Sequence, residues 1–327
     1  MKLARYMGQG TIEICDEVMP ECPTDGLLAQ TEACGLCSGE LMDWYMEGKI
    51  PHVLGHEVSA KVIESQSEAF PVGSRIVPHH HAPCMQCQLC HEGLFVQCQT
   101  WRKTKLNPGG MAQYFAVARE NLTDCHLAND ILPINAALTE PLACVQKAIH
   151  QTGIRNKIHQ KPKIAVIGLG TMGMLHLFSL QTEFPSNELI GYEVNPLRLQ
   201  HAQSLKYIAK EPCEASEADF VFVCPGAQSA MDLATKIIRP GGTILLFAPF
   251  TPGLNINIPI NNLYFKDVSL VTSYSAGPPD MTNALRHIRE GGFTASIAVS
   301  DFISLEELPD AYQAMKTGKL LKPMVVF

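Results

Sequence analysis

The chain has 327 residues, 46% of them hydrophobic and 17% charged, which is ample for a large core and favours two domains. Its net charge is −7 and it has no basic run, which argues against nucleic acid or an anionic membrane surface as a partner. No stretch reads as a signal peptide or is long enough to span a bilayer. We therefore expect a cytoplasmic protein whose twelve cysteines are metal ligands or free buried thiols.

The first part of the chain, up to about Cys144, has short β-type segments broken by glycine and proline. Examples are residues 58–63, 75–77 and 112–117. Strands at this spacing predict a compact, mostly β domain.

Four cysteines lie within this part as a C-x2-C-x2-C-x7-C run: Cys84, Cys87, Cys90 and Cys98. Thiolates this close can converge on one tetrahedral ion without help from distant parts of the fold, and zinc is the ion that four sulfur ligands favour. An iron–sulfur cluster is the chemical alternative. Because four thiolates leave no open position, the site is predicted to be structural.

From Pro162 the pattern changes to apolar strands that alternate with helices. Strands are expected at 164–167, 188–192, 220–223 and 243–247, with helices extending through residues 180, 205 and 238. This alternation predicts a parallel sheet covered on both faces, in an α/β fold. A helix near 281–289, an amphipathic stretch near 305–315 and a strand at 323–327 are expected to follow.

A glycine turn directly follows the first of these strands and opens a helix. It reads Gly168-Leu-Gly170-Thr171-Met172-Gly173, the pattern of a dinucleotide-binding turn. The first glycine permits the tight turn, the second lets the backbone approach a pyrophosphate at the helix N-terminus, and the third permits close packing of helix on strand.

Two charged residues beyond the turn bear on the choice of cofactor. Glu193 ends the next strand, where a carboxylate can accept both ribose hydroxyls of NAD and would repel the 2′-phosphate of NADP. Arg198 is expected to pack along the adenine side. NAD is therefore the predicted cofactor, with a surface glutamate as the alternative reading of Glu193.

Five further sequence fragments bear on the family to which the chain is similar. They are Gly35-Leu36-Cys37, Gly55-His56-Glu57, Gly109-Gly110-Met111, Thr139-Glu140-Pro141-Leu142 and Arg239-Pro240-Gly241-Gly242. With the cysteine run and the glycine turn, these fragments resemble the zinc-containing medium-chain dehydrogenases/reductases over essentially the whole chain. The Glu140-Pro141-Leu142 form is most similar to the polyol (sorbitol-like) and threonine dehydrogenase branches.

The resemblance implies a GroES-like mostly-β catalytic domain at residues 1–146 and 274–327, with a zinc lobe at about 84–98, and a Rossmann NAD-binding domain at 147–273. It also implies a catalytic zinc held by Cys37, His56 and a carboxylate, hence two zinc ions per chain. Either Glu57 or Glu140 can be that carboxylate. We expect Glu140 as the resting ligand and Glu57 as the partner that exchanges with it.

The implied activity is hydride transfer between a secondary alcohol or polyol (or its ketone) and NAD, in a homodimer or homotetramer. One departure stands out, because the family's usual proton relay after the catalytic cysteine is replaced by Gly39 and Met42. This departure motivates the alternative of a zinc- and NAD-binding homologue with little activity, acting as a sensor or structural protein. A redox pair of Cys34 and Cys37 is a third reading. The run His79-His80-His81 is read as structural, as a pocket wall or as an extra metal site.

Overall fold

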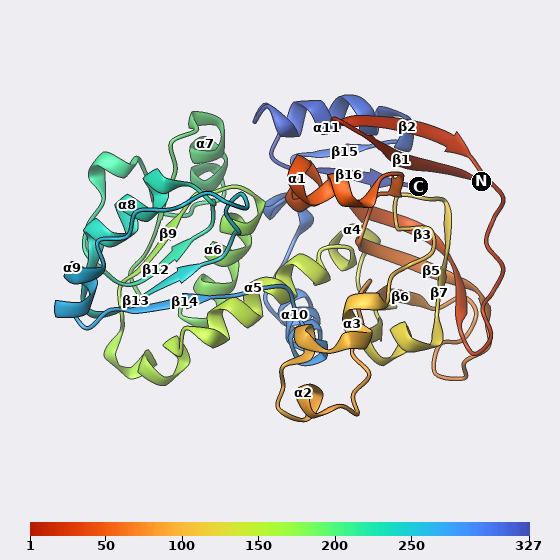
Figure 1. Ribbon diagram of the computed structural model, residues 1–327, viewed down its shortest axis with the longest axis horizontal. Helices are drawn as coiled ribbons and strands as arrows, with labels where there is room; N and C mark the ends of the chain where they lie inside the picture. Colours follow the sequence, from red (N-terminus) through yellow and green to blue (C-terminus); the bar gives the residue numbers. More distant parts are fainter. The chain divides into compact units, whose positions relative to one another are not determined.

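The computed structural model describes residues 1–327, apart from the side chain of Ile158. The chain forms two compact units, one made of residues 1–143 and 276–327 and the other of residues 144–275 (Figure 1). Among the described residues, no helix has the length and apolarity needed to cross a membrane.

The first unit is built on a seven-stranded sheet. Its strands follow the order β15-β16-β3-β5-β6-β8, and β7 pairs with β3. They are β3 (Leu27–Gly35), β5 (Glu57–Ser65), β6 (Arg75–Pro78), β7 (Tyr114–Val117), β8 (Cys125–Leu127), β15 (Asp301–Ile303) and β16 (Pro323–Val326). A second sheet has the order β2-β1-β4, from β1 (Lys2–Gly8), β2 (Thr11–Asp16) and β4 (His52–Val53).

Short helices cover this unit: α1 (Asp43–Met46), α2 (Gln88–His91), α3 (Gln99–Lys103), α4 (Pro133–Ala136), α10 (Pro278–Glu290) and α11 (Leu308–Lys316). Strand β3 pairs antiparallel with β5, and Gly35 lies opposite Glu57. Buried side chains such as Leu27, Ala29 and Val58 join Tyr312 of α11 in one apolar core, so the C-terminal segment is part of the same unit.

The second unit is a six-stranded parallel sheet of order β11-β10-β9-β12-β13-β14. The strands are β9 (Ile164–Ile167), β10 (Leu189–Tyr192), β11 (Ala209–Lys210), β12 (Ala218–Val223), β13 (Ile238–Leu246) and β14 (Ser269–Thr272). The helices are α6 (Thr171–Glu183), α7 (Pro196–Ser204), α8 (Gln228–Ile237) and α9 (Ile260–Phe265), and α5 (Thr139–Gln151) begins in the first unit and ends in the second.

The strand order reverses at β9, so α6 and α8 lie on opposite faces of this sheet (Figure 1). Right-handed crossovers that run in opposite directions along a sheet place their helices on opposite faces. Strands β9 and β12 are buried along their whole length, as expected for a sheet covered on both faces. The predicted α/β class and the Rossmann arrangement are therefore confirmed.

Three details differ from the sequence-based prediction. The strand expected from residue 112 begins at Tyr114. The helix expected through Ile238 ends at Ile237, because Ile238 adopts extended backbone and begins β13. The short connection between Leu205 and Phe220 contains the two-residue strand β11, which the sequence pattern does not reveal.

Candidate functional site

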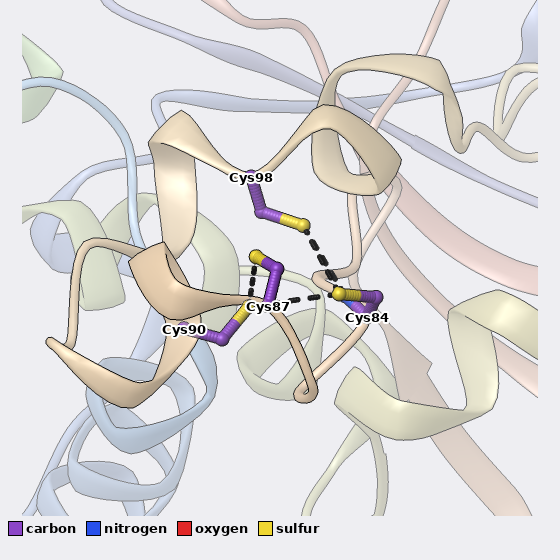
Figure 2. A group of neighbouring side chains, drawn as sticks. All are labelled: Cys84, Cys87, Cys90 and Cys98. Carbon is purple, nitrogen blue, oxygen red and sulfur yellow. Dashed lines mark hydrogen bonds between the residues drawn. The ribbon is translucent and has the colours of Figure 1, made fainter.

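The four cysteines of the C-x2-C-x2-C-x7-C run point toward a common centre (Figure 2). The Sγ atoms of Cys87 and Cys90 are 3.5 Å apart, those of Cys98 and Cys84 are 3.6 Å apart, and those of Cys84 and Cys90 are 4.0 Å apart. A tetrahedron of sulfurs at the usual zinc–sulfur bond length has an edge of about 3.8 Å. The four donors therefore fit a single zinc ion.

Local backbone geometry brings these thiols together and sets their acidity. Although burial opposes the charged form, backbone N–H groups of Cys84, Trp101 and Thr100 lower the pKa of the Cys98 thiol to about 6. Burial raises the pKa of the Cys90 thiol to about 12. These shifts favour the thiolate of Cys98 and the neutral thiol of Cys90.

A second group of donors is formed by Cys37, His56 and Glu57, whose ligand atoms lie within 4.8 Å of one another. Cys37 follows β3 and begins the 3-10 helix Ser38–Leu41, while His56 and Glu57 stand at the start of β5. Because β3 and β5 are paired, the three donors meet at one end of the sheet. A thiolate, an imidazole and a carboxylate are a ligand set that leaves zinc a fourth position.

Glu40 supports this group, and the sequence reading did not identify it. Its side chain is 2% exposed and accepts hydrogen bonds from the backbone N–H of Gly55 at 2.8 Å and of Cys37 at 3.4 Å. One carboxylate oxygen also lies 3.3 Å from Nδ1 of His56. Burial opposes a charged His56, yet the negative charges of Cys37 and Glu40 raise the pKa of His56 well above its ordinary value. The electrostatics of the group therefore favour a cation.

Glu57 has a buried partner of its own. The Lys322 ammonium pairs with the Glu57 carboxylate, and both side chains are only 1% exposed. Lys322 also donates to the Leu36 carbonyl oxygen at 2.8 Å, which holds the pair beside Cys37. The lysine balances the charge of a carboxylate that would be costly to bury alone.

Glu140 is the fourth residue predicted for the catalytic zinc, and the structure does not bring it into the group of Cys37, His56 and Glu57. It lies in the first turn of α5 and groups instead with His79 and His80. Its carboxylate is 4.0 Å from Nε2 of His79. Gly39, at a position where a relay hydroxyl is usual, donates its backbone N–H to the Cys37 sulfur at 3.3 Å.

The predicted dinucleotide turn lies in the second unit between β9 and α6. Gly168 has a φ of +84°, a left-handed conformation that favours glycine. Gly170 precedes the helix and is extended, and a side chain at Gly173 would collide with the Gly168 carbonyl. Thr171 begins the helix, and its buried hydroxyl has no hydrogen-bond partner among the described residues. The carbonyl oxygen of Met172 lies 2.8 Å from Nδ1 of His176.

Glu193 organises this turn from the end of β10. Its Oε2 accepts from the Leu169 N–H at 2.6 Å, and its Oε1 accepts from the N–H groups of Val194 and Asn195, each at 2.8 Å. Arg198, in the first turn of α7, lies beside Gly170 and has a buried Nε with no partner in the described part of the chain. A carboxylate, an unsatisfied guanidinium nitrogen and a helix N-terminus are groups that could hold a dinucleotide.

Two family models match the chain. The alcohol dehydrogenase GroES-like domain matches residues 23–126, and the zinc-binding dehydrogenase domain matches residues 192–301, so that together they cover well over half of it. The chain therefore belongs to the zinc-containing medium-chain dehydrogenase/reductase family. The predicted resemblance is confirmed.

Curated relatives and solved structures are similar along the full length. The chain is 27% identical to D-altritol 5-dehydrogenase of Agrobacterium fabrum, with 94% of both chains covered, and 26% identical to sorbitol dehydrogenase of Halalkalibacterium halodurans, with 99% of both covered. The structure of L-idonate 5-dehydrogenase from Escherichia coli matches with a TM-score of 0.84 at 22% identity, covering 100% of this chain and 98% of that one.

Proposed function

We propose that the protein transfers a hydride between a secondary alcohol or polyol, or the corresponding ketone, and NAD. The observation that carries this proposal is the group of Cys37, His56 and Glu57, because it offers three ligands of the kinds that hold a catalytic zinc and leaves one position for substrate. A zinc ion bound there would polarise a substrate oxygen and lower the pKa of an alcohol.

The chain's own residues prepare this centre in two ways. Glu40 accepts from the backbone around His56 and orients the imidazole, as outer carboxylates do for metal-ligating histidines. Lys322 pairs with the Glu57 carboxylate, which has an oxygen within 4.8 Å of the ligand atoms of Cys37 and His56. We assign Glu57 as the resting carboxylate ligand, in place of the Glu140 expected from the sequence.

A polyol is the substrate class best supported by the relatives. D-altritol 5-dehydrogenase and sorbitol dehydrogenase are named for polyols, and D-xylulose reductase A of Aspergillus oryzae, 24% identical, is named for a related ketose. The alternative of a sensor or structural homologue, suggested by Gly39 and Met42, is not favoured because these relatives are dehydrogenases by name.

A panel of polyols, secondary alcohols, sugars and threonine, each with NAD and NADP, tests the activity through absorbance of the reduced nicotinamide. We expect turnover of at least one polyol with NAD. Fully metallated protein that reduces neither cofactor with any member of the panel would contradict the proposed activity.

We also propose that NAD is preferred to NADP because of Glu193. The similar structures carry both forms, since the dehydrogenase of Sinorhizobium meliloti was solved with NADP and that of Escherichia coli CFT073 with NADH. Three backbone N–H groups hold the Glu193 carboxylate just beyond β10, the position from which an acidic residue binds the ribose 2′-hydroxyl in the dinucleotide-binding pattern. Glu193→Gln should reduce the ratio of kcat/KM for NAD over NADP by roughly 10-fold to 100-fold, since it removes the charge repulsion. Equal use of both cofactors by the unmodified protein would refute the preference.

Finally, we propose a homo-oligomer, dimeric or tetrameric. Strand β14 ends the order of the second unit's sheet, and nearby Tyr264 and Phe265 are 76% and 79% exposed. Exposed aromatic side chains beside a sheet edge are typical of a protein–protein interface. Sedimentation velocity should give a dimer or tetramer, with Phe265→Lys shifting it toward monomer. A monomer at micromolar concentration would contradict this.

A further inference from the structure

A row of stacked rings leads away from His56, one of the three donors of the candidate catalytic group. The ring of His80 packs on that of His56, His81 packs on His80, and Trp101 packs on His81, with centroid distances of 4.6, 4.1 and 4.3 Å. The rings come from the residue before β5, from the segment after β6 and from α3, so three parts of the first unit form one surface. Charges that act on this row therefore lie beside the catalytic group.

Lys49 brings a positive charge to this row. It ends the 3-10 helix Glu47–Lys49, its side chain is exposed, and its ammonium nitrogen lies 3.4 Å from the centre of the Tyr45 ring. Burial is the main cause that lowers the pKa of His81 to about 4 and that of His80 well below its ordinary value, and the charge of Lys49 acts in the same direction on both. The ammonium group is therefore close enough to both rings to act on them.

Lys105 brings a second positive charge from the other side of the row. It is exposed and directly follows Thr104, whose carbonyl oxygen lies 2.7 Å from Nδ1 of His81. Burial is the main cause of a lowered pKa at His52 in β4, and the ammonium groups of Lys49 and Lys105 both lower it further. Two lysines from segments distant in the sequence thus act on the same part of the unit.

No carboxylate of the protein neutralises these two charges. Neither lysine forms an ion pair with a described carboxylate, Glu47 in the same 3-10 helix included. The other carboxylates of this region have partners of their own: Glu40 lies beside His56, Asp43 pairs with Lys316, and Glu57 pairs with Lys322. Although the chain as a whole carries a net charge of −7, this region presents two unpaired positive charges.

We propose that the substrate is a polyol with an anionic group, a phosphate ester or a carboxylate, at one end, and that Lys49 and Lys105 bind this group. An ammonium group forms charge-assisted hydrogen bonds with either anion. The proposal rests on the dehydrogenase activity proposed above and narrows its substrate. The anionic group is neither cleaved nor transferred, since the carbinol carbon gives a hydride to NAD and its hydroxyl gives a proton to solvent.

Matched sets of substrates test this proposal on the zinc-loaded full chain. Each set contains a pentitol or hexitol, its terminal phosphate ester and the aldonic acid of the same carbon chain, and kcat/KM is measured with NAD at low ionic strength. In at least one set we expect the phosphate ester or the aldonate to exceed the polyol by about 10-fold or more. The gain should lie mainly in KM, because the lysines bind a group that does not react. Which anion gains distinguishes a phosphate from a carboxylate.

Two variants connect the gain to the lysines. Lys49→Gln and Lys105→Gln remove the charge, and each should lower kcat/KM for the anionic substrate by roughly 10-fold while leaving that for the neutral polyol unchanged. A purely structural role would affect both substrates alike. The matched control is Lys61→Gln, which changes an exposed lysine of β5 roughly 15 Å along the strand from His56 and should affect neither substrate.

Two results would overturn the proposal. One is a neutral polyol that is oxidised as efficiently as its charged counterparts in every set, and the other is an unchanged KM for the anionic substrate in both Lys49→Gln and Lys105→Gln. If no member of any set is oxidised, the dehydrogenase activity itself is contradicted, and calorimetry on the zinc-loaded chain then tests the lysines alone. Tighter binding of the phosphate ester than of the polyol, lost in Lys49→Gln, supports them as an anion site, whereas equal binding contradicts it.

Discussion

The cysteine lobe and the group of Cys37, His56 and Glu57 are both candidate zinc sites in the same unit, but they are built differently. The lobe takes all four donors from residues 84–98, and backbone N–H groups set the acidity of Cys98. The second group takes its donors from β3 and β5 and is supported by the buried side chains of Glu40 and Lys322. The lobe is closed by four thiolates, whereas the second group leaves a position open.

This difference indicates how each site depends on the rest of the fold. A lobe of short, irregular backbone with a small apolar cluster around Cys90, Cys98 and Trp101 has little else to hold it together. The second group lies against a large core that includes Cys34, Leu36 and Val58. We therefore expect metal loss to reduce stability mainly in the lobe and to reduce activity mainly at Cys37.

The largest expected effect comes from Cys90→Ser. Structural zinc contributes on the order of 10 kcal/mol to the folding of small metal-binding domains, so losing one ligand should destabilise the first unit by several kcal/mol. Thermal unfolding followed by circular dichroism should show a fall in Tm of 10 °C or more. The matched control is Cys125→Ser, outside both groups of ligands, which should keep its full metal content. An unchanged Tm in Cys90→Ser would contradict a structural ion.

Cys37→Ser should reduce activity strongly and stability only slightly. Removing a thiolate ligand removes an ion that contributes several kcal/mol of transition-state stabilisation, so kcat/KM should fall on the order of 1,000-fold or more. The Tm should fall much less than in Cys90→Ser, since the surrounding core remains packed. If Cys37→Ser lowers the Tm as much as Cys90→Ser does, the two sites do not differ in their contribution to stability.

The sequence predicts the two sites unequally well for the same physical reason. The spacing of Cys84, Cys87, Cys90 and Cys98 already requires proximity, and the glycine turn at Gly168 is equally local. Lys322 pairs with Glu57 only because β16 joins the sheet beside β3, which no local pattern reveals. Glu40 could have been found, because a polar acid three residues after Cys37 matches a capping box.

Lys322→Met tests the buried support of the second group without changing any of its metal ligands. It removes the partner of a carboxylate that is 1% exposed, and breaking a buried ion pair typically costs about 3–5 kcal/mol. Urea unfolding of the metal-loaded protein measures the loss. The double variant Lys322→Met/Glu57→Gln should recover part of it, since no unpaired charge remains. If the double variant is no more stable than the single one, the pair is not the source of the effect.

The smallest effect is expected for Glu40→Gln, which tests whether the second group depends on an outer carboxylate. The amide keeps the size of the side chain and can still accept from Gly55, but it loses the negative charge 3.3 Å from His56. Zinc affinity at Cys37 should fall by about 10-fold to 100-fold, or about 1.4–2.7 kcal/mol, while the cysteine lobe keeps its ion. Competition with a chromophoric chelator separates the two ions by their affinities.

The same titration of Glu92→Gln, an exposed carboxylate beside the lobe, supplies the control. Because the lobe draws its support from backbone N–H groups, removing a neighbouring charge there should leave its affinity unchanged, and a loss equal to that of Glu40→Gln would show that net charge, not the contact with His56, governs metal binding.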